Sequence, residues 1–392
     1  MADAGPDHKL GLVLTGGGAR AAYQVGVLKA ISEFLPRQAH SPFQIICGTS
    51  AGALNAATLA VNAREFRRGI KYLCNVWKNF RVEDVYRTDA IGVFVNTIRW
   101  IAGLVLSGLG INRLKRVSLL DNTPLAEFLS EILPCEKIQD NIDAGALHAL
   151  SITASGYGSG QSVTFYQGVP DIQPWTRARR VGIPARIETA HLLASSAIPF
   201  LFPAVHINRE YFGDGSMRQI APISSALHLG ATRVLVISVG PNGEERPSRN
   251  RIGDYPSLAQ IAGHALNSIF LDTVEVDMER IQRTNRALEL MPEEAHQKLG
   301  LHHIDVLIIA PSQSIERIAE HHTRYLPWTI RLLLRMVGVM RGSGANLVAY
   351  LLSEKRFCRA LIDMGYRDAL ARREEIMDFL NPSAATGHDL VQ

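Results

Sequence analysis

The sequence predicts an α/β fold with a central, mainly parallel β-sheet flanked by helices, together with a helical C-terminal extension. Two strand–loop–helix segments lead to this prediction. In the first, the apolar run Lys9–Leu14 enters the glycines Gly16-Gly17-Gly18, and Ala21–Phe34 has apolar side chains at helical spacing. In the second, Phe43–Cys47 enters Gly48-Thr49-Ser50-Ala51-Gly52, and an alanine-rich segment follows. The repeated pattern is typical of parallel strands covered by helices.

Later segments extend this pattern. Further strands are expected at Leu150–Ser155, Ser162–Tyr166, Arg233–Val239 and Asp305–Ala310. Residues Arg64–Leu133 are expected to be mainly helical, and Pro241–Tyr255, rich in Pro, Gly, Asn and charge, is expected to be an exposed connection. From Ser312 onward the chain is expected to be helical, with a disordered polar tail after Pro382. We therefore predict an α/β catalytic domain over residues 8–310 and a helical extension with a disordered tail over 311–392.

Composition narrows the class of protein. The 392 residues are 47% hydrophobic and 20% charged, and the formal net charge of +4 is too small to indicate nucleic-acid binding. The four cysteines are widely separated, so neither a zinc site nor a disulfide framework is expected, and Cys47 is expected to fill space in the core. No secretory signal peptide and no clean transmembrane helix is recognisable. A cytoplasmic protein is predicted, with the option of peripheral attachment to a membrane.

The segment Gly48-Thr49-Ser50-Ala51-Gly52 has the G-x-S-x-G pattern of a nucleophile elbow. Between a strand and a helix, this pattern forms a sharp turn that holds the serine hydroxyl clear of the backbone. Gly48 and Gly52 are needed because side chains there would collide where the strand and the helix cross. An ordinary Ser/Gly turn is the alternative interpretation. The placement between strand and helix favours Ser50 as a nucleophile.

The loop Gly16-Gly17-Gly18-Ala19-Arg20 also lies between a strand and a helix. Consecutive glycines can aim several backbone N–H groups at one point, as an oxyanion hole requires, and Arg20 could add positive charge. A solvated surface arginine is the alternative for Arg20. The glycines also approach a dinucleotide fingerprint, but the next strand ends in Ile46-Cys47-Gly48 without the acidic residue that would hold a ribose. A nucleotide site is therefore not expected.

The general base is harder to assign from local sequence. In an α/β-hydrolase, the nucleophile elbow follows several strands, and an Asp or Glu and then a His complete the triad. Ser50 follows only one earlier strand, so this chain fits that fold poorly. Asp214 stands between Gly213 and Gly215, where a tight turn could point its carboxylate into a cleft. For that short segment alone, an ordinary Asx turn is the simpler interpretation.

Four blocks, in this order, resemble the patatin-like phospholipase family. They are Gly16–Arg20 with the following Tyr23–Leu28, Gly48–Gly52, Ala194–Pro203, and Asp214-Gly215. The resemblance extends over about Gly11–Pro222. It implies lipid acyl hydrolysis by a Ser50–Asp214 dyad without histidine, an oxyanion hole at the amides around Gly17 and Gly18, and no metal or organic cofactor. Ala21 and Ser216 depart from the family pattern, which puts fine loop geometry in question but not the reaction.

The expected activity is that of a phospholipase A or lysophospholipase, with a phospholipid or other lipid ester as substrate. Two alternatives stay open: an acyltransferase that uses the same acyl-enzyme, and a non-catalytic lipid-binding regulatory protein. Two stretches could contact a membrane surface. Arg324–Arg341 combines arginines with apolar residues and places Arg331 and Arg335 on one helix face, and Val93–Ile111 has few charges. Ordinary packed helices with surface arginines are the alternative for both.

Overall fold

The computed structural model describes residues 9–89, 92, 94–100, 102, 118–240, 273–336 and 349–381. Within this part of the chain, ten strands form one mixed sheet with the main order β10-β9-β1-β2-β3-β4-β6-β5. Five neighbouring strands are parallel. They are β10 (Asp305–Ile309), β9 (Ala231–Ile237), β1 (Lys9–Leu14), β2 (Ile45–Thr49) and β3 (Ala149–Gly156). The predicted α/β fold with a mainly parallel central sheet is therefore confirmed.

The remaining strands form a largely antiparallel side of the sheet. They are β4 (Ser162–Gly168), β5 (Trp175–Arg177), β6 (Arg180–Pro184), β7 (Val205–Ile207) and β8 (Glu210–Asp214). Strand β4 runs antiparallel to β3, and the last three residues of β3 also pair with β8. Strands β5 to β8 were not predicted, because three to five residues are too few to show an alternating pattern.

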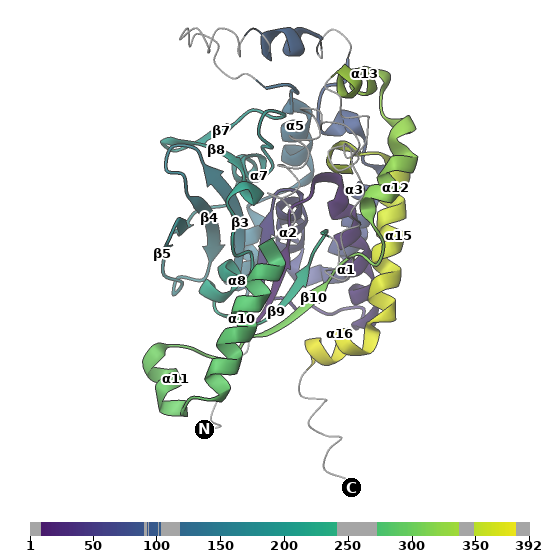
Figure 1. Cartoon of the computed structure of the whole chain (residues 1–392). Coiled ribbons are helices and arrows are strands. Elements are labelled where there is room, and N and C mark those ends of the chain that lie inside the picture. The colour runs from purple at the N-terminus through teal and green to yellow at the C-terminus, as the bar shows by residue number, and fades with distance from the viewer. Residues whose placement is uncertain are drawn as a thin grey trace, which may run out of the picture.

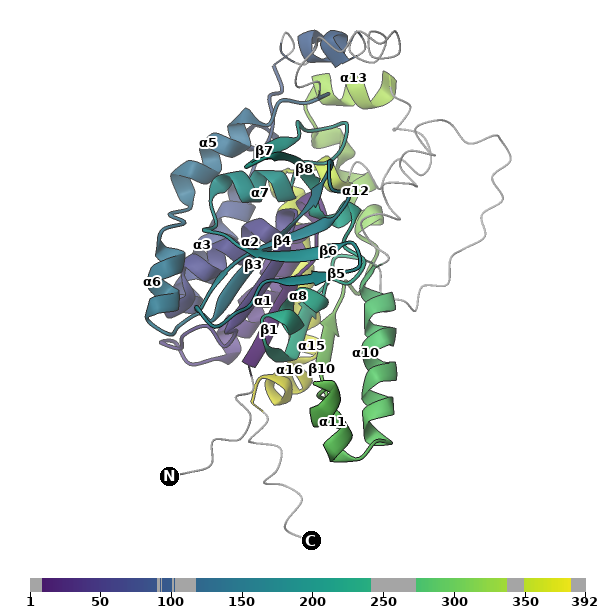
Figure 2. The same ribbon diagram turned by 90° about the vertical axis from the view of Figure 1, so that its left-hand side faces the viewer.

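Helices cover both faces of the parallel strands (Figures 1 and 2). Side chains alternate along β1, so that Leu12 and Leu14 belong to the larger core while Val13 faces a second, smaller core. The larger core includes α1 (Ala22–Phe34), α2 (Ala51–Val61) and α3 (Phe66–Asn79), and the smaller one includes α8 (Ser224–His228) and α10 (Thr273–Glu289). Cys47 is buried in the smaller core, as expected.

Three further helices follow in the middle part of the chain. They are α5 (Thr123–Ile132), which lines the pocket described below, α7 (Thr189–Ser195), and α6 (Lys137–Asp143), which packs against α2 and β4. Helix α11 (Glu293–Leu299) lies at the end of the molecule opposite α13 (Trp328–Met336) (Figure 1). None of the described helices combines the length and apolar composition that crossing a bilayer requires. The predicted connection 241–255, the tail after Pro382 and most of 93–111 lie outside the described residues.

The C-terminal part is helical, as expected. It contains α12 (Ile315–His322), a 3-10 turn η5 (Thr323–Tyr325), α13 (Trp328–Met336), α15 (Lys355–Ala371) and α16 (Arg373–Leu380). Helix α15 packs closely on α1: a Cβ atom at Gly26 would lie 2.1 Å from the carbonyl oxygen of Ile362, and one at Gly365 would lie 2.2 Å from that of Tyr23. The Tyr23 hydroxyl also donates to Asp368 at 3.0 Å. The division at residue 310 stays a prediction; in the described residues the two parts share the larger core.

Candidate active site

Ser50 occupies the sharp turn between β2 and α2. Its backbone has φ 53° and ψ −129°, a conformation that residues other than glycine rarely adopt. The flanking glycines allow the crossing of strand and helix. A Cβ atom at Gly48 would lie 2.6 Å from the Cα of Ala53, and one at Gly52 would lie 2.3 Å from the carbonyl oxygen of Leu14. The hydroxyl is thus held in a fixed position by the backbone on both sides.

Asp214 meets Ser50 from the end of β8. The Ser50 hydroxyl donates a hydrogen bond to Asp214 Oδ2 at 2.6 Å, and the aspartate side chain is fully buried. Asp214 Oδ1 accepts the backbone N–H of Ser216 at 2.9 Å, which is the Asx turn considered above. The two interpretations of Asp214 are therefore compatible, because each uses a different carboxylate oxygen.

Burial raises the pKa of Asp214 to about 6, although hydrogen bonds from Ser50 and Ser216 oppose this shift. An aspartate with this pKa is a better proton acceptor than one of ordinary pKa, and it is still largely ionised at neutral pH. The environment of Asp214 therefore suits a general base.

Ser195, at the end of α7, holds the Ser50 turn in place. Its hydroxyl accepts the backbone N–H of Ser50 at 2.8 Å and donates to the carbonyl oxygen of Thr153 at 2.6 Å. The same carbonyl lies 2.0 Å from where a Cβ atom of Gly215 would be, so position 215 has no room for a side chain. Ser195 lies in the block Ala194–Pro203, but nothing in the sequence gave it this role.

The glycine loop lies directly beside Ser50. A Cβ atom at Gly16 would be 3.0 Å from the Cβ of Ser50. Gly18 has φ +56°, and a Cβ atom there would lie 2.4 Å from the carbonyl oxygen of Tyr350. The start of the loop is held by a hydrogen bond, because Gln24 Nε2 donates to the carbonyl oxygen of Thr15 at 2.8 Å. Asn55 in turn donates to Gln24 at 2.9 Å. The predicted oxyanion glycines and the predicted nucleophile are thus brought together.

Arg20 is buried, so the alternative interpretation of a solvated surface arginine is wrong, and its part in the oxyanion hole stays a prediction. Its side chain is fully buried, pairs with Glu316 of α12 at 2.8 Å and lies 4.5 Å from the ring centroid of Tyr350. Although burial acts in the opposite direction, Arg20 holds the pKa of Glu316 below its ordinary value. The arginine is therefore no solvated surface residue, and its charge is balanced by Glu316 of the C-terminal part.

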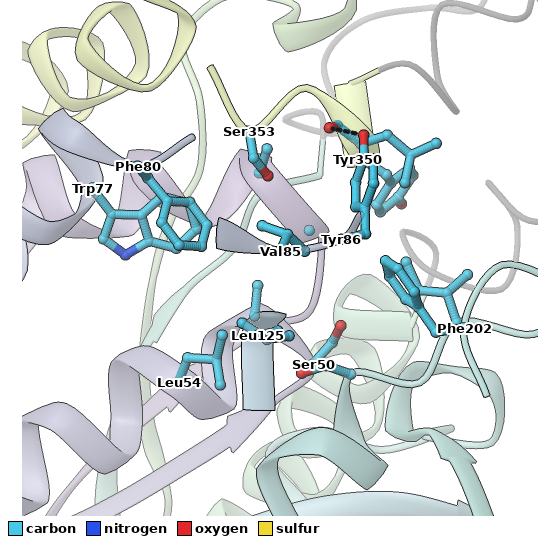
Figure 3. A pocket seen from close by; sticks show the side chains of 16 residues that line it. Ser50, Leu54, Trp77, Phe80, Val85, Tyr86, Leu125, Phe202, Tyr350 and Ser353 are labelled. Carbon is cyan, nitrogen blue, oxygen red and sulfur yellow. Dashed lines mark hydrogen bonds between the residues drawn. The ribbon is translucent and has the colours of Figure 1, made fainter. Parts of the chain in front are cut away.

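A narrow, mainly apolar pocket opens at Ser50. Figure 3 shows Trp77 and Phe80 on one side of it and Tyr350 and Phe202 on the other. The remaining lining includes Leu54, Val85, Tyr86, Leu125, Ile198, Leu351 and Ser353. The lining contains no histidine among the described residues, and His191, on the helix of Ser195, packs against Phe165 at 4.7 Å between ring centroids. The described site thus contains a serine and an aspartate but no histidine partner.

Comparison with known proteins places this site in a family. The sequence model of patatin-like phospholipases matches residues 12–227, more than half of the chain. A lysophospholipase, nte1, from Aspergillus terreus is 54% identical over 56 residues, which are 14% of this chain and 3% of that protein. The chain therefore spans only a small fraction of that relative's length.

Two solved structures are similar at low sequence identity. VipD from Legionella pneumophila is 16% identical, with 96% of this chain and 67% of that chain covered and a TM-score of 0.34. The human GIVD cytosolic phospholipase A2 is 13% identical, with 96% and 59% covered and a TM-score of 0.43. The family match over residues 12–227 contains Ser50, Asp214 and the glycine loop. This chain is a member of the patatin-like phospholipase family.

Proposed function

We propose that the protein hydrolyses lipid acyl esters through a Ser50–Asp214 dyad and an acyl-enzyme intermediate. The observation that carries the proposal is the 2.6 Å hydrogen bond between the Ser50 hydroxyl and a buried Asp214, beside the apolar pocket that Ser50 helps to line. A carboxylate within hydrogen-bond distance can take the proton of the attacking hydroxyl. The apolar lining suits a fatty acyl chain.

In the first step, Ser50 Oγ attacks the ester carbonyl carbon while Asp214 takes its proton. The carbonyl oxygen becomes an oxyanion, and the backbone amides around Gly17 and Gly18, beside Ser50, are the proposed donors that stabilise it. When the intermediate collapses, the bond to the alcohol oxygen breaks and Asp214 returns the proton to the departing alcohol. The acyl group is then bonded to Ser50.

In the second step, a water molecule attacks the acyl-enzyme while Asp214 takes one of its protons. Collapse releases the fatty acid, and the proton returns from Asp214 to Ser50 Oγ. Both steps use groups of the protein and water, so the proposal requires no metal or organic cofactor. A phospholipid or lysophospholipid is the proposed substrate, with its acyl chain between the aromatic side chains of the pocket.

Labelling with a fluorophosphonate tests this proposal. A fluorophosphonate reacts with an activated serine, so mass spectrometry of the labelled protein should find the modification on Ser50. Ser50→Ala should remove both the labelling and the hydrolysis of a lipid ester. Modification of another serine, with Ser50 unmodified, would contradict the assignment.

The pH dependence of kcat/KM provides a second test. Asp214 must be ionised to accept a proton, and burial raises its pKa to about 6. Activity should therefore be full above this pH and fall tenfold per pH unit below it. An acidic limb near the ordinary aspartate value of about 4 would show that Asp214 is not the group that titrates.

We further propose that the protein works at a membrane surface. Exposed apolar side chains gather at one end of the molecule, on α13 and on helical residues 94–100, which lie close together in both views (Figures 1 and 2). They are Trp328, Leu332, Phe94, Val95 and Ile98. Arg331 is half-buried, with its Nε buried and without a hydrogen-bond partner, and the side chain of Arg335 lies outside the described residues. The apolar residues are therefore the better candidates for membrane contact.

A double variant, Trp328→Ala/Leu332→Ala, should bind lipid vesicles more weakly than the wild type. Each side chain would lose apolar area buried in the bilayer, at about 25 cal/mol per Å². Sedimentation with vesicles measures the loss, and hydrolysis of a water-soluble short-chain ester should be unchanged. Leu290→Ala, at an exposed leucine at the opposite end of the molecule, is the matched control. Equal binding by the double variant and the control would contradict membrane contact through α13.

A further inference from the structure

Two arginines converge on one tyrosine next to the apolar surface of α13. Arg324 Nη2 and Arg356 Nη1 each lie 2.8 Å from the hydroxyl oxygen of Tyr325. Both guanidinium groups also lie over the Tyr325 ring, at 4.9 Å and 4.6 Å from its centroid. The two positive groups are therefore held within two hydrogen-bond lengths of each other.

No carboxylate of the described residues lies within ion-pair distance of either arginine. Glu354, the acidic residue nearest to Arg356 in sequence, instead accepts the backbone N–H groups of Arg356 and Phe357 as the N-cap of α15. Two like charges so close together repel each other, and a bound anion would remove this repulsion.

The cluster of Arg324, Tyr325 and Arg356 has the hydrogen-bonding groups that an anion site requires. A phenol oxygen has two lone pairs and one hydrogen. When both lone pairs accept from arginines, the O–H group is left to donate. Arg324, Arg356 and Tyr325 therefore offer several donors and no free acceptor. Guanidinium groups bind phosphate and carboxylate oxygens well, because their planar N–H groups can meet two oxygens at once, and a phosphate has enough oxygens for both arginines.

The position of the cluster points to the source of the phosphate. Tyr325 precedes the exposed Trp328 by three residues, and Arg356 follows the pocket-lining Ser353 by three residues. We propose that Arg324, Tyr325 and Arg356 bind the phosphate group of a membrane phospholipid, between the apolar surface of α13 and the pocket at Ser50. The choice of a lipid as the source rests on the proposed function, whereas the phosphate site itself rests only on the cluster.

Vesicle binding tests the proposal in the Ser50→Ala background, so that the result does not depend on turnover. The double variant Arg324→Gln/Arg356→Gln should bind vesicles that contain phosphatidic acid about tenfold more weakly. Vesicles of equal surface charge that contain oleate in place of phosphatidic acid should show a much smaller difference. The control pair Arg317→Gln/Arg367→Gln removes the same charge from exposed positions of α12 and α15 and should retain binding. The proposal would be overturned if both double variants lost vesicle binding equally. It would also be overturned if Arg324→Gln/Arg356→Gln lost binding equally on phosphatidic acid and oleate vesicles.

Titration calorimetry with inorganic phosphate separates the two sources of phosphate. If only the variants with intact Arg324 and Arg356 bind inorganic phosphate, while vesicle binding is alike in all of them, the membrane phospholipid is ruled out as the ligand and a free phosphate takes its place at the same site. If neither measurement separates Arg324→Gln/Arg356→Gln from the control pair, the proposal is wrong. A protein without ester hydrolysis would contradict the proposed function and leave both binding measurements valid.

Discussion

Replacing Asp214 by Asn should lower kcat by roughly a thousandfold or more. The amide has nearly the shape of the carboxylate, but it cannot take the proton of Ser50 or of the hydrolytic water. The fold should be retained. Burial raises the pKa of Asp214 above its value in the unfolded chain, so at a pH above 6 the ionised carboxylate lowers the free energy of unfolding. A neutral Asn side chain does not have this destabilising charge. Initial rates on a lipid ester and the thermal unfolding midpoint measure the two effects.

Histidine variants provide the control for this experiment. His191 is buried on the helix that carries Ser195, and its Nδ1 accepts the backbone N–H of Glu188 rather than contacting the dyad. His191→Gln should therefore keep most of the activity. A loss as large as that of Asp214→Asn, with folding intact, would restore a serine–histidine mechanism.

Replacing Glu316 by Gln should affect stability and catalysis together. The exchange removes the carboxylate that pairs with the fully buried Arg20, and the free energy of unfolding should fall by about 3 kcal/mol. This is the lower end of the range for a broken buried pair, because a quarter of the Glu316 side chain is exposed. Arg20 follows Gly18 by two residues, so the glycine loop should lose its fixed geometry. Since that loop is proposed to stabilise the transition state, kcat should fall while KM changes little.

Glu320→Gln is the matched control, because Glu320 is exposed on the same helix α12. Denaturant unfolding and steady-state kinetics of both variants, side by side, measure the difference. A Glu316→Gln variant with the stability of the control would show that solvent or another group compensates the charge of Arg20. A less stable variant with unchanged kcat would show that the pair supports the fold but not the loop.

The features that were predictable from sequence are local ones. The elbow at Ser50 and the glycine loop each join a strand to the helix that follows it, so the pattern and the structure it forms lie within a few dozen residues. Asp214 is different. It reaches Ser50 because β8 pairs antiparallel with the end of β3, and a five-residue strand carries no pattern that would reveal this pairing. Its role was indicated only by the glycines on either side of it and by the order of the family's blocks.

The contacts between the two ends of the chain were not predictable at all. A lone arginine in a glycine loop is usually solvated, and nothing near Arg20 in the sequence indicates that Glu316 and Tyr350 bury it. The same holds for the pocket, which Leu351 and Ser353 complete from beyond the segment that matches the family. Such contacts depend on the packing of α15 against α1, and pair interactions between distant residues leave no trace in a single sequence.

The burial of Arg20 by Glu316 has a consequence for biosynthesis. A growing chain emerges N-terminus first, so Ser50 and the glycine loop leave the ribosome long before Glu316 and Tyr350. Until those residues arrive, Arg20 lacks its ion pair with Glu316 and its contact with the Tyr350 ring, and the pocket lacks the side that Tyr350, Leu351 and Ser353 line. A nascent or prematurely terminated chain would therefore carry both residues of the dyad without a finished site. The proposed lipid hydrolase would therefore gain its whole pocket only after residue 353 has been synthesised.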